Sequence, residues 1–208
     1  EVDFEDIHSL QNALNGVEEV YHCAAKVSFH PKDEKKMYQT NIEGTKQLLF
    51  ACQNSSVKKF LFVSSIAVLD GLNENGELDE SSDFNPKIDH SAYAISKHFS
   101  EMEVWRASAE GLNTVIVNPG IIIGSGNWKE SSGTLFKELG ENAYTFSGGT
   151  SYVDVRDVAQ ISIELMEKNI FGERFILISE NKKYQDVANF IKQKLGKQAV
   201  KLVPNGLL

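Results

Sequence analysis

Residues 59–65 read Lys-Phe-Leu-Phe-Val-Ser-Ser, an apolar run of strand length that ends in two serines. A second run, Asn-Thr-Val-Ile-Val at 113–117, ends in Asn-Pro-Gly at 118–120. Short continuous runs of this kind are typical of strands that are buried on both faces. Between them, Ser91 is a good N-cap for a helix that we expect to reach Gly111. The segment 59–120 therefore predicts two parallel strands joined by a long polar loop and a helix.

The same alternation of strands and helices continues on both sides of this segment. Further strands are predicted at 19–24, 174–178 and 200–203, and helices at 6–14, 31–53, 155–168 and 184–195, with a short helix near 134–139 and an extended piece at 151–153. This alternation predicts an α/β fold whose doubly wound parallel sheet is covered on both faces. Such sheets bind ligands beyond the carboxyl ends of their strands, which directs attention to the residues after Ala24, Val63 and Val117.

The composition describes one globular domain and favours small molecules as its partners. Of the 208 residues, 41% are hydrophobic, and the net charge of -8 argues against nucleic acid or an anionic membrane as the main partner. No apolar stretch approaches the roughly 20 residues of a membrane span. Cys23 and Cys52 are expected to be buried thiols in a reducing compartment, which indicates the cytoplasm. The histidines lack the spacing of metal ligands, so no metal is expected.

A Tyr–Lys pair in the predicted helix is the candidate for proton-transfer chemistry. Tyr93 and Lys97 are four residues apart and share one face near the helix N-terminus. An ammonium close to a phenol favours the phenolate, so we expect the pKa of Tyr93 to lie below its usual value of about 10. Ser65, at the end of a strand, is suitably placed to hold a reacting oxygen. The spacing alone fits an exposed Lys beside a half-buried Tyr equally well, but the order of the surrounding elements favours a site.

With that order in view, the chain resembles an extended short-chain dehydrogenase/reductase, a group that includes nucleotide-sugar epimerases and dehydratases, dihydroflavonol reductases and hydroxysteroid dehydrogenases. The matching motifs are His-Cys-Ala-Ala at 22–25, Thr-Asn-Ile-Glu-Gly-Thr at 40–45, Phe-Val-Ser-Ser at 62–65, Tyr-Ala-Ile-Ser-Lys at 93–97, Asn-Pro-Gly at 118–120 and Tyr-Val-Asp-Val-Arg-Asp-Val-Ala at 152–159. The resemblance implies a Rossmann-like dinucleotide-binding domain at 1–180. Residues 181–208 would begin a small substrate-binding part, to which 121–150 contribute loops.

The resemblance also assigns roles to individual residues. Tyr93 would be the general acid/base, Lys97 would bind the nicotinamide ribose, and Ser65 would hold the substrate oxygen. NAD or NADP would contact these residues and a wider set: Asp3, Phe4, Ala24, Ala25, Lys26, Asn41, Ser64, Pro119, Gly120 and Ile121. Two of the set fit a structural role equally well, Asn41 as a helix-interior amide bonded to the backbone and Asp3 as a solvated loop acid.

Substrate and partner assignments rest on fewer residues. Trp128 and Tyr152 are candidates for stacking on a planar substrate or a sugar, and core packing explains them equally well. Members of the family often form homodimers through the helices that carry Asn41 and Tyr93, and Met102 is compatible with such an interface. Complete members begin with a glycine-rich turn that binds the pyrophosphate. We therefore expect roughly 60 residues before Glu1, and a further segment after Leu208.

The sequence is compatible with three functions. The first is an NAD(P)-dependent reductase or dehydrogenase that acts on a carbonyl or an alcohol. The second is a nucleoside-diphosphate-sugar epimerase, which uses the same oxidation transiently. Dehydratases of the group carry an acidic pair close to the serine, whereas Ile-Ala-Val-Leu follows Ser65 here, so dehydration is disfavoured. The third is a catalytically silent NAD(P)-binding regulatory protein, because a fold does not establish a function.

Overall fold

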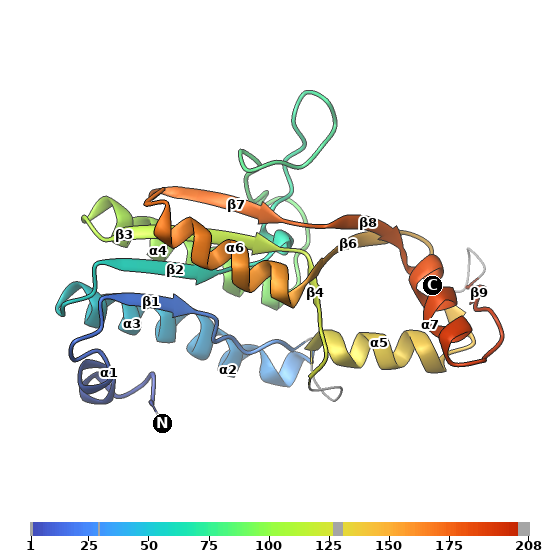
Figure 1. The fold of residues 1–208 in the computed structure, drawn as a ribbon, viewed down its shortest axis with the longest axis horizontal. Helices are drawn as coiled ribbons and strands as arrows, with labels where there is room; N and C mark the ends of the chain where they lie inside the picture. The colour runs from blue at the N-terminus through green and yellow to red at the C-terminus, as the bar shows by residue number, and fades with distance from the viewer. Residues whose placement is uncertain (1, 29, 127–130, 204–208) are drawn as a thin grey trace. The chain divides into compact units, whose positions relative to one another are not determined.

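The computed structural model describes residues 2–28, 30–126 and 131–203, which form two compact units. The first unit comprises Glu1–Asn118 and Ile161–Ile176, and the second comprises Pro119–Gln160 and Leu177–Leu208. Figure 1 shows the order of the elements along the chain. Both units are discontinuous in sequence, so they do not test the predicted division at residue 180, which remains a prediction.

A parallel sheet is the centre of the first unit. Its strand order is β1 (Glu19–His22), β2 (Lys59–Val63), β3 (Asn113–Pro119) and β7 (Glu173–Leu177). β1 and β2 pair in parallel, as do β2 and β3, with Lys59 opposite Asn113 and Val63 opposite Val117. Consecutive side chains of β2 and β3 are fully buried because both faces of the sheet are covered, which explains the continuous apolar runs. The predicted α/β class is confirmed.

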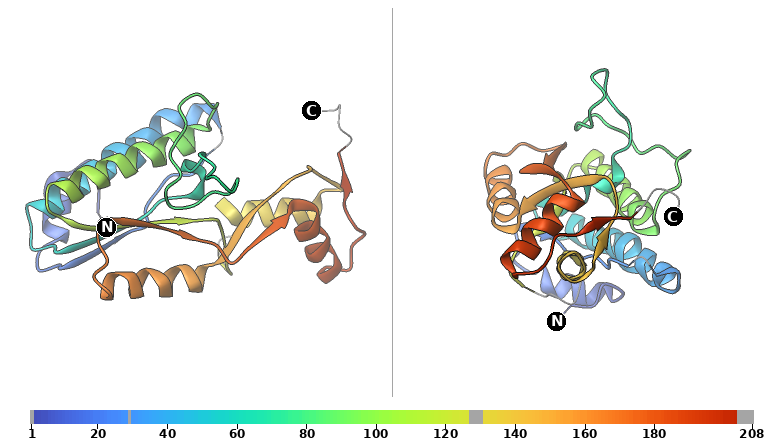
Figure 2. Two further views of the ribbon diagram at one scale, coloured as in Figure 1. Left: turned by 90° about the horizontal axis from the view of Figure 1, so that it is seen from above. Right: turned by 90° about the vertical axis from the view of Figure 1, so that its right-hand side faces the viewer.

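Helices cover both faces of this sheet (Figure 2). On one face lie α3 (Gly44–Gln53) and α4 (Ala92–Ala109), and α1 (Ile7–Ala13) packs on α3. The part of α6 (Val155–Glu167) that belongs to this unit lies on the other face. The predicted helix at 31–53 is a composite of a 3₁₀ turn (Pro31–Asp33), α2 (Glu34–Tyr38), a π-helical turn (Gln39–Glu43) and α3.

The second unit contains a smaller sheet of order β4 (Ile121–Ile123), β6 (Gly149–Asp154) and β8 (Glu180–Lys183). It also contains α5 (Ser131–Glu141), α7 (Tyr184–Lys194) and a short pair of strands, β5 (Tyr144–Thr145) and β9 (Lys201–Leu202). The sequence did not predict β8, because all four of its residues are exposed and none is apolar. This strand exists through its antiparallel pairing with β6 rather than through burial.

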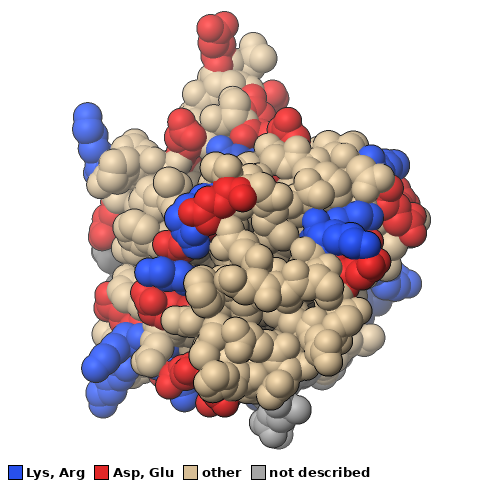
Figure 3. Space-filling view, turned by 90° about the vertical axis from the view of Figure 1, so that its left-hand side faces the viewer, with Lys and Arg blue, Asp and Glu red and all other residues tan. Residues whose placement is uncertain are grey.

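The helices and the surface charges bear on the predicted absence of a membrane span and of a charged partner. None of the helices in the described part of the chain is long and apolar enough to cross a membrane. On the face shown in Figure 3, basic and acidic side chains are interspersed and do not gather by sign.

The structure differs from the prediction for one of the two cysteines. Cys52 is buried as predicted, but Cys23 is exposed. The prediction for Cys23 was wrong because β1 ends at His22, so that Cys23 begins the loop beyond the strand.

Candidate active site

The structure brings Ser65 and Tyr93 into contact and places Lys97 close by. Ser91 caps α4 by accepting a hydrogen bond from the Ala94 N–H at 3.2 Å, which sets Tyr93 and Lys97 in its first two turns. Ser65 follows β2 and begins a short 3₁₀ helix, with its Oγ accepting from the Ala67 N–H at 3.2 Å. The Ser65 side chain lies near enough to the Tyr93 phenol to lower its pKa. Two elements that are distant in sequence therefore present adjacent hydroxyls at one strand end.

Lys97 is a buried cation at the same strand end. Its side chain donates a hydrogen bond to the Val63 carbonyl at 2.7 Å, and its Nζ lies 4.0 Å from the centre of the Phe62 ring. The residue is only 2% exposed, and this burial lowers the pKa of the ammonium to about 7, although the nearby Glu101 carboxylate raises it in part. Lys97 therefore holds its proton less firmly than an exposed lysine does.

The pKa of Tyr93 differs from the prediction in direction. Burial raises the pKa of the phenol, and the hydrogen bond from Ser65 lowers it by less. The predicted depression was wrong because the Lys97 ammonium is directed at the Val63 carbonyl and the Phe62 ring, while the phenolate would be poorly solvated. Tyr93 is consequently a protonated phenol at neutral pH, which is the form that donates a proton.

Asn41 joins the loop after β1 to α4. Its amide pairs with both backbone groups of Lys26, accepting from the N–H at 2.7 Å and donating to the carbonyl at 2.9 Å. The same amide donates to Ser96 Oγ on α4 at 2.9 Å. Asn41 lies in the π-helical turn, a helix irregularity that is frequent at functional sites. These contacts fit the structural role predicted as an alternative for Asn41, an amide bonded to the backbone. The bonded backbone, however, belongs to Lys26 in the loop after β1 and not to the helix of Asn41.

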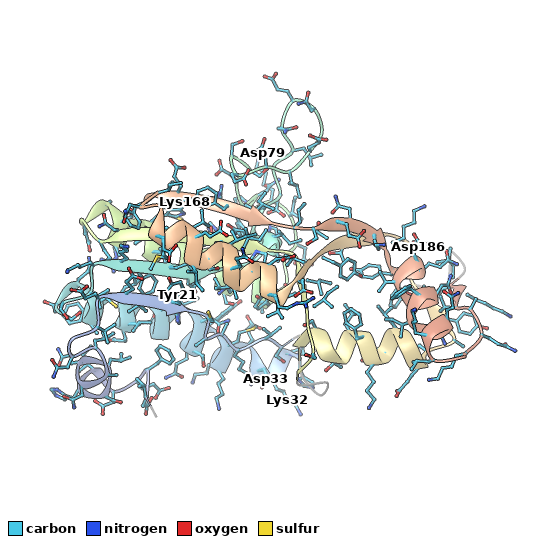
Figure 4. All side chains as sticks on the ribbon, in the orientation of Figure 1. Tyr21, Lys32, Asp33, Asp79, Lys168 and Asp186 are labelled. Carbon is cyan, nitrogen blue, oxygen red and sulfur yellow. The ribbon has the colours of Figure 1, made fainter. Side chains whose placement is uncertain are left out.

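The remaining predicted cofactor residues of the first unit lie just after β1 and β2 or before α1. Ala24 and Ala25 are exposed after β1, and Lys26 forms an ion pair with Asp33, labelled in Figure 4, at 3.2 Å. Ser64, directly after β2, is buried. Before α1, Asp3 is an exposed loop residue whose carboxylate accepts a hydrogen bond from the Glu5 N–H, and Phe4 packs on the ring of His22.

Other predicted residues belong to the second unit or lie outside the described residues. Pro119 ends β3, the Gly120 N–H donates to the Leu177 carbonyl at 3.0 Å, and Ile121 begins β4. Tyr152 is 3% exposed and forms part of this unit's core, which favours the packing alternative over substrate stacking. Trp128 lies outside the described residues.

Sequence reasoning missed a buried polar cluster behind Ser65. Asn118 at the end of β3 donates to the Ser65 carbonyl at 3.0 Å and to the Glu101 carboxylate at 2.6 Å. Arg174 of β7 lies 3.5 Å from the same carboxylate. Glu101 is four residues after Lys97, so the periodicity of α4 placed it on the Tyr93–Lys97 face. That spacing could have indicated Glu101, but glutamate side chains are usually exposed, so the sequence alone did not suggest a buried one.

Comparisons with known proteins identify the family. The model of the NAD dependent epimerase/dehydratase family matches residues 1–177. The chain belongs to this family. Relatives include the Sterol demethylase protein B of Methylococcus capsulatus, 28% identical over 93% of this chain and 60% of that protein, and a putative dihydroflavonol 4-reductase of Synechocystis, 29% identical over 86% and 54%. The UDP-glucose 4-epimerase of Thermus thermophilus, solved in complex with NAD, shares the fold with a TM-score of 0.78 and 23% identity over 98% of this chain and 70% of that one.

Family membership confirms the resemblance and the Rossmann-like class, and the family is NAD dependent. The chain spans about 60% or less of the length of the curated relatives named above. The hydrogen-bond donors of the site suit the binding of a nicotinamide dinucleotide. The Lys97 ammonium has three N–H groups and uses one on the Val63 carbonyl, which leaves donors for ribose hydroxyls. The small exposed side chains of Ala24 and Ala25 leave the backbone at the end of β1 open to a ligand.

Proposed function

We propose that the protein is an NAD(P)-dependent oxidoreductase that reduces a carbonyl substrate, or oxidises the corresponding alcohol, with Tyr93 as the general acid/base. The observation that carries this proposal is the proximity of the Ser65 side chain to the Tyr93 phenol beside the buried Lys97 ammonium. When bound, the nicotinamide group supplies or accepts the hydride. The residues of this chain then have to hold the substrate oxygen and to move one proton to or from it.

Each of the three residues has a defined task in this proposal. Ser65 Oγ and Tyr93 Oη both bind the carbonyl oxygen and polarise the C=O bond. As the carbonyl carbon gains a hydride, the Tyr93 O–H bond breaks and its proton passes to the developing alkoxide, leaving a neutral alcohol and a phenolate. A positive charge on Lys97 favours that phenolate until a solvent proton restores the phenol.

The raised pKa of Tyr93 means that the phenol holds the proton that a carbonyl reduction would use. At neutral pH the phenol carries its proton, and a carbonyl reduction consumes one. A relative named as a putative dihydroflavonol 4-reductase is consistent with this direction. The apolar residues after Ser65 lack the acidic pair of dehydratases, so loss of water from the substrate is not proposed.

Epimerisation of a nucleoside-diphosphate sugar is the second candidate, because the family name includes it and it requires the same proton transfer. The full-length protein, incubated with NADH or NADPH and a panel of aldehydes, ketones and thioesters, separates the candidates. A reductase consumes reduced nicotinamide in proportion to product. An epimerase converts UDP-glucose to its epimer with no net change in the cofactor. If neither activity is found, the proposal is wrong and the catalytically silent alternative replaces it.

The proposal includes a homodimer formed through the helices of the Asn41 and Tyr93 segments. Apolar side chains are exposed on both of these helices, with Phe50 on α3 and Met102 on α4 each 52% exposed. An interface there would bury them, and it is typical for an exposed apolar patch to mark an association surface. Sedimentation equilibrium of the full-length protein tests this part, which a monomeric mass would contradict.

A further inference from the structure

The cluster behind Ser65 connects the backbone carbonyl of this residue to the Glu80–Ser82 part of the loop between β2 and α4 through three side chains. We propose that Asn118, Glu101 and Arg174 form a positioning relay that holds Ser65 in register with Tyr93. None of the three touches the Tyr93 or Ser65 hydroxyl, so all three are positioning residues. The inference rests on the proposed function, because it concerns the placement of the proton-transfer pair.

Asn118 is the member of the relay that touches Ser65. Its side chain is fully buried, and its Nδ2 donates both to the Ser65 carbonyl at 3.0 Å and to Glu101 Oε1 at 2.6 Å. A carbonyl and a carboxylate only accept hydrogen bonds, so only the NH₂ side of the amide satisfies both. The orientation of Asn118 is therefore dictated by its neighbours. Through it, the carbonyl of Ser65 is tied to α4, the helix that carries Tyr93.

Glu101 is the charged centre of the relay. Its side chain is 3% exposed, and burial raises the pKa of its carboxyl group, which the contacts with Ser64, Asn118 and Arg174 oppose. A buried carboxylate is destabilising unless it is paired and hydrogen-bonded, and here Arg174 and Asn118 provide both kinds of partner. Such a pair is weak grounds for a stability role, because an apolar pair of equal volume is often as stable. A role in fixing geometry explains its location better.

Arg174 extends the relay to the loop between β2 and α4. Its Nε donates to the Glu80 carbonyl at 2.7 Å and its Nη2 to the Ser82 carbonyl at 2.6 Å. The Glu80 carboxylate in turn accepts from the Ile176 N–H of β7 at 3.0 Å. Figure 4 labels Asp79, the preceding residue, on the part of this loop that projects beyond the sheet. The guanidinium fork thus holds the loop with two donors and faces Glu101 with a third.

Ser65 needs this support because its own element holds it weakly. The β2–β3 ladder ends just before it, at the bond from the Ser64 N–H to the Val117 carbonyl. Beyond that bond, the backbone of Ser65 is held by Asn118 and by the short 3₁₀ helix that it begins. A misplacement of about 1 Å can lower a rate about 100-fold, so the Asn118 contact is a direct control on catalysis.

The test compares relay variants of the full-length protein in the presence and absence of the Ser65 hydroxyl. Glu101→Leu removes the acceptor of Asn118 and the partner of Arg174, and we expect kcat to fall about 10- to 100-fold with KM changed less than about twofold. Glu101→Gln keeps an acceptor for Asn118 and is expected to retain most of kcat. Glu110→Gln removes the charge from an exposed pair with Arg106 at the C-terminal end of the same helix and serves as the matched control, with no expected effect.

The decisive comparison is a double-mutant cycle with Ser65→Ala. If the relay acts through Ser65, Glu101→Leu changes kcat less than about twofold once the hydroxyl is absent. An equal loss in both backgrounds overturns the inference, since the effect would then be a general one. Asn118→Ala breaks the relay at a second point, and if both variants lose the fold, the cluster is a folding element and the inference is wrong. A wild-type protein without turnover instead overturns the proposed function itself.

Discussion

Replacing Lys97 with methionine is expected to stabilise the fold while it abolishes the proposed activity. Lys97 is 2% exposed, and its pKa is lowered from 10.5 to about 7 on burial. Between these values the unfolded chain binds more protons than the folded one, so the free energy of unfolding rises with pH through this window. The sign follows because burial disfavours the charged form. Protonation of Lys97 in the unfolded chain therefore lowers the free energy of unfolding most near pH 7 and least near pH 10.5.

The magnitude follows from the same two pKa values. At about 1.36 kcal/mol per pKa unit, the penalty for holding Lys97 buried is about 4 kcal/mol near pH 7 and about 2 kcal/mol near pH 9. Methionine of similar length avoids the penalty but leaves the Val63 carbonyl without its donor, which costs about 1–3 kcal/mol. The variant should therefore be more stable than wild type by about 1–3 kcal/mol near pH 7. This advantage should shrink by about 2 kcal/mol near pH 9.

Urea unfolding of the full-length protein at the two pH values measures both quantities. Lys46→Met, which replaces an exposed lysine on α3, is the matched control and should show no pH-dependent difference from wild type. A stability difference between Lys97→Met and wild type that does not change between the two pH values would refute the reasoning. So would a variant that is less stable than wild type at both.

Three further changes test other parts of the site. Ser65→Ala should lower kcat by roughly 100-fold. The Ser65 side chain lowers the pKa of Tyr93, so its removal should raise that pKa, and a pH–rate profile should show carbonyl reduction persisting to higher pH. Asn41→Leu breaks both bonds to the loop after β1 and should lower the free energy of unfolding by about 2–4 kcal/mol, measured in urea. Gly120→Ala would place a Cβ 2.6 Å from a β6 carbonyl and should destabilise by about 1–3 kcal/mol. Gly126→Ala, whose added Cβ meets none of the described atoms within 4 Å, should be neutral in the same assay.

Much of the fold follows from the sequence because its strands are buried on both faces. The runs at 59–63 and 113–117 are continuous for that reason, and the structure has strands there. The cap at Ser91 and the position of α4 follow from the local chemistry of a helix start. The π-helical turn at Asn41 was missed because it depends on contacts with Lys26 and Ser96, which are distant in sequence.

The site divides in the same way between local and distant causes. The spacing of Tyr93 and Lys97 predicts a shared helix face, but the direction of the Lys97 ammonium depends on the end of β2. The pKa of Tyr93 was predicted in the wrong direction because burial is a property of the assembled unit. Glu101 was missed for a related reason, since the partners that allow a carboxylate to be buried come from β3 and β7.

The most direct test of the central claim is the turnover of Tyr93→Phe. This change removes one hydroxyl and keeps the ring, so the fold and the environment of Lys97 should be preserved. With a carbonyl substrate found in the panel, the proposed role of Tyr93 predicts a fall in kcat of about 100- to 10,000-fold in the full-length protein. Cofactor binding, followed by the fluorescence of reduced nicotinamide, should change little. Carbonyl reduction by Tyr93→Phe at the wild-type rate would contradict the account.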